Sequence, residues 1–336
     1  MLKQNLVSII SPCYNGEEYI STFLDSLLQQ DYPSVELIFV DDGSSDGTRA
    51  KVLSYVNRFK ERGYELRYVH KENGGQASAI NVGLKYVTGE FVMWMDSDDA
   101  LVPDALSIKV EFLHDHPNIG FVICQGYMVL ASDPNKVIGI QMRQHGSNND
   151  DLFKDLINDT NVIFTPAAYL TRTTALFKAI PQRHIFESRE GQNWQLLLPL
   201  AYTTTYGYID KPLYLYVVRE KSHSRKHRDY RDQVWRFNGF AELQSQTVMH
   251  IPDMPISEKE RWLHNIQTIT NRRKIRLALD NYHFRDWIHC WSCESSWKAQ
   301  LKYNPVSFYT IKAIRSLNST IKHILQRAGV RTHTNS

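Results

Sequence analysis

Short apolar runs alternate with amphipathic stretches along the first hundred residues. Four runs that indicate buried strands lie at residues 6–10, 35–40, 66–69 and 91–95. Between them, apolar residues recur three or four positions apart, which predicts helices over residues 19–28, 52–59 and 77–87. Strands that alternate with helices in this way are typical of βαβ units. The pattern therefore predicts an α/β fold with a parallel sheet, and it fades after about residue 110.

Polar turn segments follow three of these runs directly. Residues 11–18 follow the first run, residues 41–48 the second and residues 96–99 the fourth. In open parallel sheets, ligands bind beyond the carboxyl ends of the strands. We therefore expect one edge of the sheet to gather the aspartates of these segments, which are Asp41, Asp42, Asp96, Asp98 and Asp99.

Close carboxylates favour a site that holds a cation, or that accepts hydrogen bonds from sugar hydroxyls and base N–H groups, because like charges otherwise repel. Oxygen ligands suit Mg²⁺ or Mn²⁺, and either ion would also bridge a diphosphate. The alternative is that these Asp, Gly and Ser residues only form turns and helix N-caps. Two such clusters after two strands weaken that alternative.

Composition and charge narrow the class of protein. Hydrophobic residues make up 42% of the 336 residues and charged residues 22%, which excludes a disordered or fibrous chain. The net charge of +3 gives no field that indicates a nucleic-acid partner. Four cysteines make no disulfide framework, and no secretory signal or run of 18 apolar residues occurs, so we expect a cytoplasmic protein. The absence of GxxxxGK[ST] and GxGxxG motifs argues against a P-loop NTPase and a dinucleotide dehydrogenase.

The N-terminal motifs resemble those of the inverting GT-A glycosyltransferases of family 2, over residues 5 to about 105. The opening VSIISPCYNGEEYI is similar to the family's first strand and turn, and the other matches are Asp41-Asp42-Gly43-Ser44 with DDGS, Asn73-Gly74-Gly75 with the N-G-G/R-G loop and Asp96-Ser97-Asp98 with the metal-binding D-x-D. The resemblance implies a Rossmann-like, mostly parallel sheet with flanking helices, and a helical C-terminal extension is expected beyond it.

The resemblance also implies roles for these residues. The donor would be a UDP-sugar, with Asp41 at the uracil edge, Asp96 on the ribose or sugar side, and Asp98 on Mn²⁺ or Mg²⁺ at the diphosphate, with Asp96 beside it. The remaining nucleotide-binding candidates are Pro12, Tyr14, Glu17, Asp42, Asn73 and Gly74.

A helix with one apolar face is predicted to begin near Gly191. Many family members carry E-D immediately before this helix, and the aspartate is the general base that inversion requires. Here Gln192 and Asn193 occupy those positions, and neither side chain can accept a proton as a base. We therefore predict Glu190 as the base and Glu187 as the second candidate. The alternative is that Glu190 is only a charge favoured at a helix N-terminus.

Asn193 is then expected to hold the acceptor or to orient Glu190. The stretch from Gly191 to about residue 228 resembles a narrower subgroup, bacterial enzymes of O-antigen and capsule assembly. Some of its members are UDP-glucose or UDP-galactose β-1,3-transferases that act on GlcNAc-diphospho-undecaprenol. The resemblance favours glucose as the donor sugar and galactose next.

Basic residues crowd the positions after a predicted edge strand at residues 213–218. Arg219 and His223 are the favoured site residues, because a basic loop that faces a diphosphate would grip it. His223 would otherwise complete the metal shell. The alternative is a solvated charge run.

The C-terminal tail carries seven Lys and Arg residues and no acidic residue after Glu294. Apolar positions recur at helical spacing from Ile311 to Leu325, which predicts a basic amphipathic helix of the kind that binds a membrane surface. The alternatives are a helix packed on the domain and a tail that binds proteins. Cys290 and Cys293 form a CxxC with no second pair of zinc ligands, so we expect no metal site there.

From these patterns we predict that the chain consists of three segments, which are a nucleotide-sugar half at 1–110, an acceptor half at 111–228 and a helical extension at 229–336. The leading function is an inverting hexosyltransferase that acts on a polyprenyl-diphosphate-linked sugar at the inner face of the cell membrane. The alternatives are a non-catalytic nucleotide-sugar-binding protein and a transferase with a different acceptor. A processive polysaccharide synthase is disfavoured, because it needs spanning helices.

Overall fold

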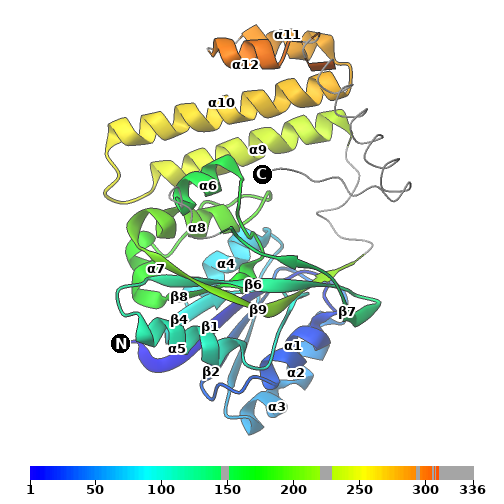
Figure 1. Ribbon diagram of the computed structural model, residues 1–336. Helices are drawn as coiled ribbons and strands as arrows, with labels where there is room; N and C mark the ends of the chain where they lie inside the picture. The colour runs from blue at the N-terminus through cyan, green and yellow to red at the C-terminus, as the bar shows by residue number, and fades with distance from the viewer. Residues whose placement is uncertain (145–150, 220–228, 293–295, 305, 307, 310–336) are drawn as a thin grey trace, which may run out of the picture. The chain divides into compact units, whose positions relative to one another are not determined.

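The computed structural model describes residues 1–144, 151–219, 229–292, 296–304, 306, 308 and 309 (Figure 1). The chain divides into two compact units. The first contains Met1–His227 and Glu242–Leu263, and the second contains Arg228–Ala241 and His264–Ser336. Residues 242–263 thus group with the unit that holds the sheet.

The first four strands form the parallel half of the sheet. They lie in the order β3-β2-β1-β4 and are β1 (Lys3–Cys13), β2 (Val35–Asp41), β3 (Glu65–His70) and β4 (Gly89–Trp94). All three pairings among them are parallel. Every residue of β2 is buried, as expected for a parallel strand covered on both faces. The predicted parallel sheet is confirmed.

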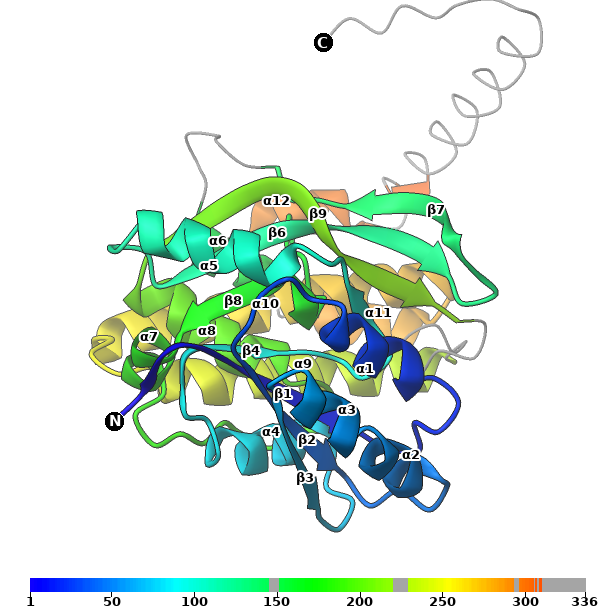
Figure 2. The ribbon, with the colours of Figure 1, turned by 90° about the horizontal axis from the view of Figure 1, so that it is seen from below.

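Helices cover both faces of this half (Figures 1 and 2). Those on one face are α1 (Ile20–Leu28), α2 (Thr48–Ser54) and α3 (Val56–Glu61), and α4 (Gln76–Leu84) lies on the other. The single helix predicted over residues 52–59 is wrong, because the chain forms two short helices on either side of Tyr55. The Tyr55 N–H donates to the carbonyl of Val52 at 3.0 Å, an i→i−3 bond that tightens the turn.

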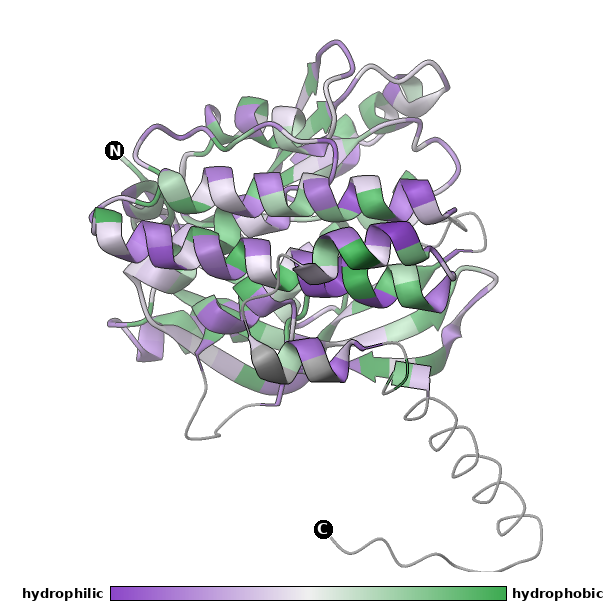
Figure 3. Ribbon diagram, turned by 90° about the horizontal axis from the view of Figure 1, so that it is seen from above, coloured by the Kyte–Doolittle hydropathy of each residue, from purple (hydrophilic) through white to green (hydrophobic). Residues whose placement is uncertain are grey.

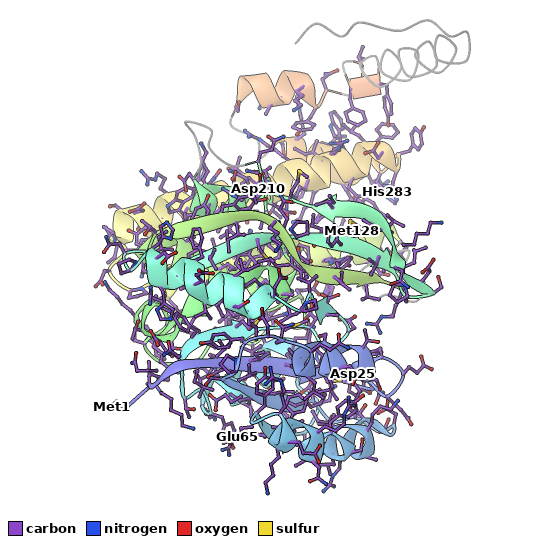
Figure 4. The ribbon with its side chains drawn as sticks, turned by 60° about the horizontal axis from the view of Figure 1, so that its bottom comes forward. Met1, Asp25, Glu65, Met128, Asp210 and His283 are labelled. Atoms are coloured by element: carbon purple, nitrogen blue, oxygen red, sulfur yellow. The ribbon has the colours of Figure 1, made fainter. Side chains whose placement is uncertain are left out.

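The second half of the sheet is mainly antiparallel, which agrees with the fading of the βαβ pattern. The order continues β8-β6-β9-β5, with β7 on β6, and the strands are β5 (Ala100–Leu101), β6 (Phe121–Leu130), β7 (Asp133–Gln141), β8 (Tyr169–Arg172) and β9 (Tyr206–Val218). Strands β6 and β9 pair in parallel, and Figure 4 labels Met128 on β6 and Asp210 on β9. The predicted edge strand is wrong, since β9 pairs with β6 and, at Tyr214 and Leu215, also with β5.

The remaining elements of the first unit surround the end of the sheet that carries the predicted acceptor half. They are α5 (Ala105–Asp115), α6 (Leu152–Asn158), the 3₁₀ turn η1 (Pro166–Ala168), α7 (Thr173–Ala179) and α8 (Asn193–Thr203). Helix α8 begins two residues after the predicted Gly191. Beneath its start, the fully buried rings of Trp94 and Tyr169 stack with centroids 6.1 Å apart. The start of α8 therefore packs on a buried aromatic layer, to which Asn193 is hydrogen-bonded through Trp94.

Helices account for the described part of the chain after residue 229, and the predicted helical extension is confirmed. They are α9 (Tyr230–Met249), α10 (Ile256–Asp280), α11 (Phe284–Ser292) and α12 (Trp297–Lys302). Polar and apolar residues are mixed along α9 and α10 (Figure 3). Among the helices that the structure describes, none has the length and apolarity needed to span a membrane. The helix predicted from Ile311 to Leu325 lies outside the described residues.

Candidate active site

The loops that follow β1 and β2 are fastened together by reciprocal hydrogen bonds. The Asn15 N–H donates to Ser44 Oγ at 2.9 Å, and the Ser45 N–H donates to Asn15 Oδ1 at 2.8 Å. Glu17 accepts a hydrogen bond from the Gly47 N–H at 2.8 Å. These bonds fix the shape of both loops at the carboxyl edge of the sheet, where ligands bind in such folds.

The two other candidates of the first loop have different surroundings. Pro12 is a buried residue of β1 in register with Val40 of β2, so it belongs to the sheet itself. The Tyr14 side chain is 50% exposed at the rim of the edge. Of these two, only Tyr14 presents a surface that a ligand can cover.

Asp41 ends β2 and is almost fully buried. Its carboxylate accepts hydrogen bonds from the Ser44 N–H at 2.8 Å and from the Tyr68 hydroxyl, and His70 Nδ1 lies 3.5 Å away. Burial alone would raise the pKa of Asp41, but the hydrogen bonds from Ser44 and Tyr68 outweigh it and lower that pKa below its ordinary value. Asp41 therefore remains an ionised acceptor at neutral pH, as recognition of a base N–H requires.

We expect Tyr68→Phe to lower the free energy of unfolding by about 1–2 kcal/mol at pH 7, because one hydrogen bond to a buried carboxylate is lost. The lowered pKa of Asp41 stabilises the fold above the pKa of the unfolded chain, and this contribution is lost as the pH falls through the folded pKa. The penalty should therefore shrink at pH 3. Urea unfolding at both pH values measures it, and an equal penalty at pH 3 and pH 7 would contradict this assignment.

Asp42 shapes the loop that precedes α4. Its carboxylate accepts hydrogen bonds from the N–H groups of Gly74 and Gly75 at 2.9 and 2.7 Å, and from Lys71 Nζ at 2.7 Å. The Asn73 side chain donates to the Asp42 carbonyl at 2.9 Å. A Cβ atom at Gly74 would lie 2.7 Å from a side-chain oxygen of α4, so a larger residue does not fit without a shift. The N-G-G loop and the DDGS loop are thus one structure.

Asp96, Asp98 and Asp99 form an acidic cluster after β4, with one carboxylate oxygen of each within 4.8 Å of the others. Asp99 is buried; its Oδ1 accepts from the Val217 N–H at 3.0 Å, while Oδ2 has no hydrogen-bond partner among the residues that the structure describes. Burial raises the pKa of Asp96 to about 6, and nearby Gln192 and Arg219 offset part of that rise. An all-oxygen cluster with an unpartnered buried oxygen fits Mg²⁺ or Mn²⁺.

Arg219 follows β9 and reaches this cluster. Its Nη2 forms an ion pair with Asp98 Oδ2, and its guanidinium carbon lies 3.9 Å from the centroid of the Tyr19 ring. The structure thus brings the predicted Arg219 into the site. His223 lies outside the described residues.

The start of α8 contacts the acidic cluster through Gln192 rather than Asn193. The buried Gln192 side chain donates to Asp96 Oδ1 at 3.3 Å. Asn193 accepts a hydrogen bond from Trp94 Nε1 at 3.0 Å and donates to the Phe164 carbonyl at 2.7 Å. Both ends of the Asn193 amide thus bind other parts of the protein, and the roles predicted for Asn193, holding the acceptor or orienting Glu190, stay predictions.

The loop that carries Glu187 and Glu190 is anchored at two points. Asn81 of α4 exchanges two hydrogen bonds with the backbone of Ile185, at 2.7 and 2.9 Å, and also donates to Glu187 Oε1 at 3.2 Å. Arg189 Nη1 donates to Asn73 Oδ1 at 3.2 Å, which ties the loop to the N-G-G loop. Glu187 is exposed and Glu190 is half-buried, two residues before Gln192.

Residues 8–177, about half of the chain, match the family model described as Glycosyl transferase family 2. The chain belongs to this family. Its curated relatives include an uncharacterized glycosyltransferase of Rickettsia typhi, 38% identical over 150 residues, which are 44% of this chain and 45% of the relative. Another is the UDP-Glc:alpha-D-GlcNAc-diphosphoundecaprenol beta-1,3-glucosyltransferase WfgD of Escherichia coli, 38% identical over 118 residues, 35% of this chain and 44% of WfgD. The aligned region spans less than half the length of both relatives.

Solved structures with this fold extend over more of the chain. Residues 1–349 of TarS from S. aureus, in complex with UDP-GlcNAc, superpose with a TM-score of 0.62 at 22% identity, covering 85% of this chain and 79% of that one. The mannosyltransferase PcManGT of Pyrobaculum calidifontis, in complex with GDP-Man and Mn²⁺, gives a TM-score of 0.57 at 18% identity, covering 94% and 81%. This likeness confirms the predicted GT-A fold.

Within this family 2 domain, the site contains residues for which the sequence predicts no separate role. Gln192 contacts Asp96, Tyr19 carries the guanidinium of Arg219, and Asn81 holds the loop of the two glutamates. The only sequence signal for Gln192 is its position in place of the first residue of the E-D pair. Tyr19 and Asn81 occur at helical spacing with apolar residues, so their pattern indicates packing and not chemistry.

Proposed function

We propose that this family 2 protein is an inverting glycosyltransferase that moves a hexose from a UDP-sugar to a sugar linked to a lipid diphosphate. The observation that carries the proposal is the convergence of three elements on one sheet edge: the ionised Asp41, the acidic cluster of Asp96, Asp98 and Asp99, and the loop of Glu190. Residues 1–110 would form the nucleotide-sugar half, residues 111–228 the acceptor half and residues 229–336 an extension.

The donor half would bind the nucleoside diphosphate with the residues that the loops hold in place. Asp41 would accept a hydrogen bond from the uracil N–H, and the backbone around Asn73 and Gly74 would border the base. Asp96, Asp98 and Asp99 would hold Mn²⁺ or Mg²⁺, which offsets the negative charge that develops on the leaving diphosphate. Arg219 supplies a further positive charge beside Asp98.

Glu190 would act on the acceptor. As the acceptor hydroxyl attacks the anomeric carbon, its proton passes to the Glu190 carboxylate, and the bond to the UDP oxygen breaks on the opposite face. Attack from the face opposite the leaving UDP converts an α-linked donor into a β-linked product. Glu187, which Asn81 already binds, is the second candidate for this role.

Similarity to WfgD supports a specific acceptor. The name of that protein gives UDP-Glc as its donor and alpha-D-GlcNAc-diphosphoundecaprenol as its acceptor. We therefore propose β-1,3 transfer of glucose, with galactose next, to GlcNAc-diphospho-undecaprenol in O-antigen or capsule assembly. The test is a screen of UDP-Glc, UDP-Gal and UDP-GlcNAc with a synthetic GlcNAc-diphospho-lipid. Transfer from UDP-Glc supports the proposal, whereas transfer only to an acceptor without a diphosphate would contradict it.

A second candidate function is nucleotide-sugar binding without transfer. The observation that favours it is Asn193, which stands where many family members carry the base and is bound to Trp94 and Phe164. Saturable binding of UDP-sugar with Mn²⁺, and no transfer to any lipid-diphosphate acceptor, would favour this candidate.

Restoring the family's aspartate tests whether a carboxylate at residue 193 can serve as the base in this protein. We expect Asn193→Asp to leave kcat unimproved and to lower the free energy of unfolding by about 1–3 kcal/mol, because a carboxylate cannot donate to the Phe164 carbonyl. Urea unfolding and steady-state kinetics measure both effects. A rise in kcat would show that a carboxylate at residue 193 is a better base than Glu190 and would contradict the role proposed for Glu190.

We also propose that the basic tail attaches the protein to the inner membrane face, where a polyprenyl acceptor resides. Removing the tail after Glu294 is a poor test, because it would also remove packing partners of α11. Trp287 and Trp291 of that helix donate to the carbonyls of Tyr303 and Gln300. Substituting Lys312, Arg315 and Lys322 together by Gln avoids this problem.

These substitutions should weaken binding to vesicles with anionic lipids at least ten-fold, since each basic residue near such a surface contributes about 1 kcal/mol. A matched control replaces three exposed basic residues of the first unit, Arg58, Arg67 and Lys211. Co-sedimentation with vesicles measures the affinity, and equal losses for the two triple variants would contradict a role for the tail.

A further inference from the structure

Arg219 makes two contacts that join distant parts of the catalytic unit. It forms an ion pair with Asp98 in the loop after β4, and its guanidinium lies over the Tyr19 ring at the start of α1. The Tyr19 hydroxyl in turn donates to the Tyr14 carbonyl at 3.4 Å. The Arg219 side chain is 24% exposed, so it is partly shielded from solvent.

The position of Arg219 coincides with a need of the acidic cluster. Three carboxyl groups whose oxygens lie within 4.8 Å of one another repel when ionised, and a cation between them lowers that repulsion. Arg219 supplies such a cation through Asp98, which is also a proposed ligand of the divalent ion. One Asp98 oxygen is thus paired with an internal positive charge that a metal ion has to displace.

We propose that Arg219 is an internal counter-ion that competes with the divalent cation for Asp98 and makes metal binding depend on the nucleotide diphosphate. This inference rests on the proposed function. Without nucleotide, the guanidinium is near Asp96 as well, but among the described residues the carboxylate with which it forms an ion pair is that of Asp98, and it remains there. When a diphosphate binds beside the cluster, Arg219 exchanges the carboxylate for a phosphate oxygen, with which a guanidinium forms strong charge-assisted hydrogen bonds.

Linkage gives this exchange a measurable consequence. If the diphosphate releases Asp98 from Arg219, then the nucleotide raises the affinity for metal, and the metal raises the affinity for nucleotide by the same factor. The ring of Tyr19 provides a fixed platform on which the guanidinium can turn between the two anions, because cation–π attraction does not depend on which anion it faces. Arg219 therefore acts as a positioning residue that favours joint loading of metal and donor.

The experiment measures Mn²⁺ binding to the full chain from the electron paramagnetic resonance signal of free Mn²⁺, with and without saturating UDP. For Arg219→Ala, we expect Mn²⁺ to bind about five-fold or more tightly without UDP than it binds to the unsubstituted protein. We also expect the tightening caused by UDP to shrink by at least the same factor. Arg219→Gln should behave as Arg219→Ala does, and Arg219→Lys should fall between them and the unsubstituted protein.

Arg58→Ala is the matched control, because it removes an exposed ion pair with Asp25 (2.9 Å) outside the acidic cluster. It should change neither Mn²⁺ constant. If Arg219→Ala and Arg219→Gln both bind Mn²⁺ without UDP no more tightly than the unsubstituted protein, the counter-ion proposal is wrong and the proposed function stands. If the unsubstituted protein binds no Mn²⁺ even with UDP, both proposals fail together.

Discussion

Asp98→Ala should lower kcat/KM for sugar transfer about 1,000-fold, and excess Mn²⁺ should not restore it. The substitution removes a carboxylate from a cluster in which one oxygen of each of the three members lies within 4.8 Å of the others, and it would leave the proposed divalent cation without one ligand. Electrostatic stabilisation of a leaving diphosphate is a large term in such reactions, and the loss of one group that provides it commonly costs two to three orders of magnitude, about 10²–10³. The rate of UDP release with donor and acceptor present measures the effect.

The matched control for Asp98 is Asp25→Ala on α1 (Figure 4). The Asp25 carboxylate is 40% exposed and is paired with Arg58. This variant should retain transfer within about two-fold, because exposed ion pairs contribute little. Transfer by Asp98→Ala at the unsubstituted rate, or full transfer by the unsubstituted protein in a strong chelator, would contradict the assignment of the metal site.

The second large effect concerns the base. Glu190→Gln should lower kcat by about 10²–10⁴, the range over which a positioned general base contributes, while the affinity for UDP with Mn²⁺ stays within about two-fold. We expect kcat to fall while UDP affinity is kept, because the substitution would remove the proposed proton acceptor for the acceptor hydroxyl and no proposed contact of the donor. Single-turnover transfer measures kcat, and calorimetry measures UDP binding.

Glu187→Gln provides the comparison within the same loop. Its Oε1 already accepts a hydrogen bond from Asn81, so we expect a loss of less than about ten-fold in kcat. The opposite ranking, with Glu187→Gln inactive and Glu190→Gln active, would exchange the two assignments. Full activity of both variants would show that neither glutamate of this loop acts as the base.

The sequence predicts the parts of this protein that depend on local pattern. Apolar runs such as residues 35–40 become β2, which is buried throughout, and the acidic segments after β2 and β4 lie at one edge of the sheet because parallel strands end at the same edge. Tyr55 marks where local pattern fails. Its helical spacing continues unbroken, yet an i→i−3 bond to Val52 divides the helix, and spacing alone does not distinguish that bond from an i→i−4 bond.

Side-chain partners that are distant in sequence could not be predicted. Asn193 looked free to act in the site, but Trp94 and Phe164 take up its amide, and only the folded chain brings these residues together. The pairing of Arg219 with Asp98 depends in the same way on the neighbouring positions of β9 and the loop after β4. Motifs thus indicated which residue types belong to the site, and tertiary packing determined which of them are available for chemistry.

The most direct test of the central claim is the configuration of the new glycosidic bond. The purified protein is incubated with UDP-glucose, Mn²⁺ and a synthetic GlcNAc-diphospho-lipid, and the product is examined by NMR for the coupling of its new anomeric proton. Because a single attack opposite the leaving UDP inverts the anomeric carbon, we predict a β-linked glucose on the acceptor. An α-linked product, or release of UDP with free glucose and no glycosylated lipid, would contradict the account.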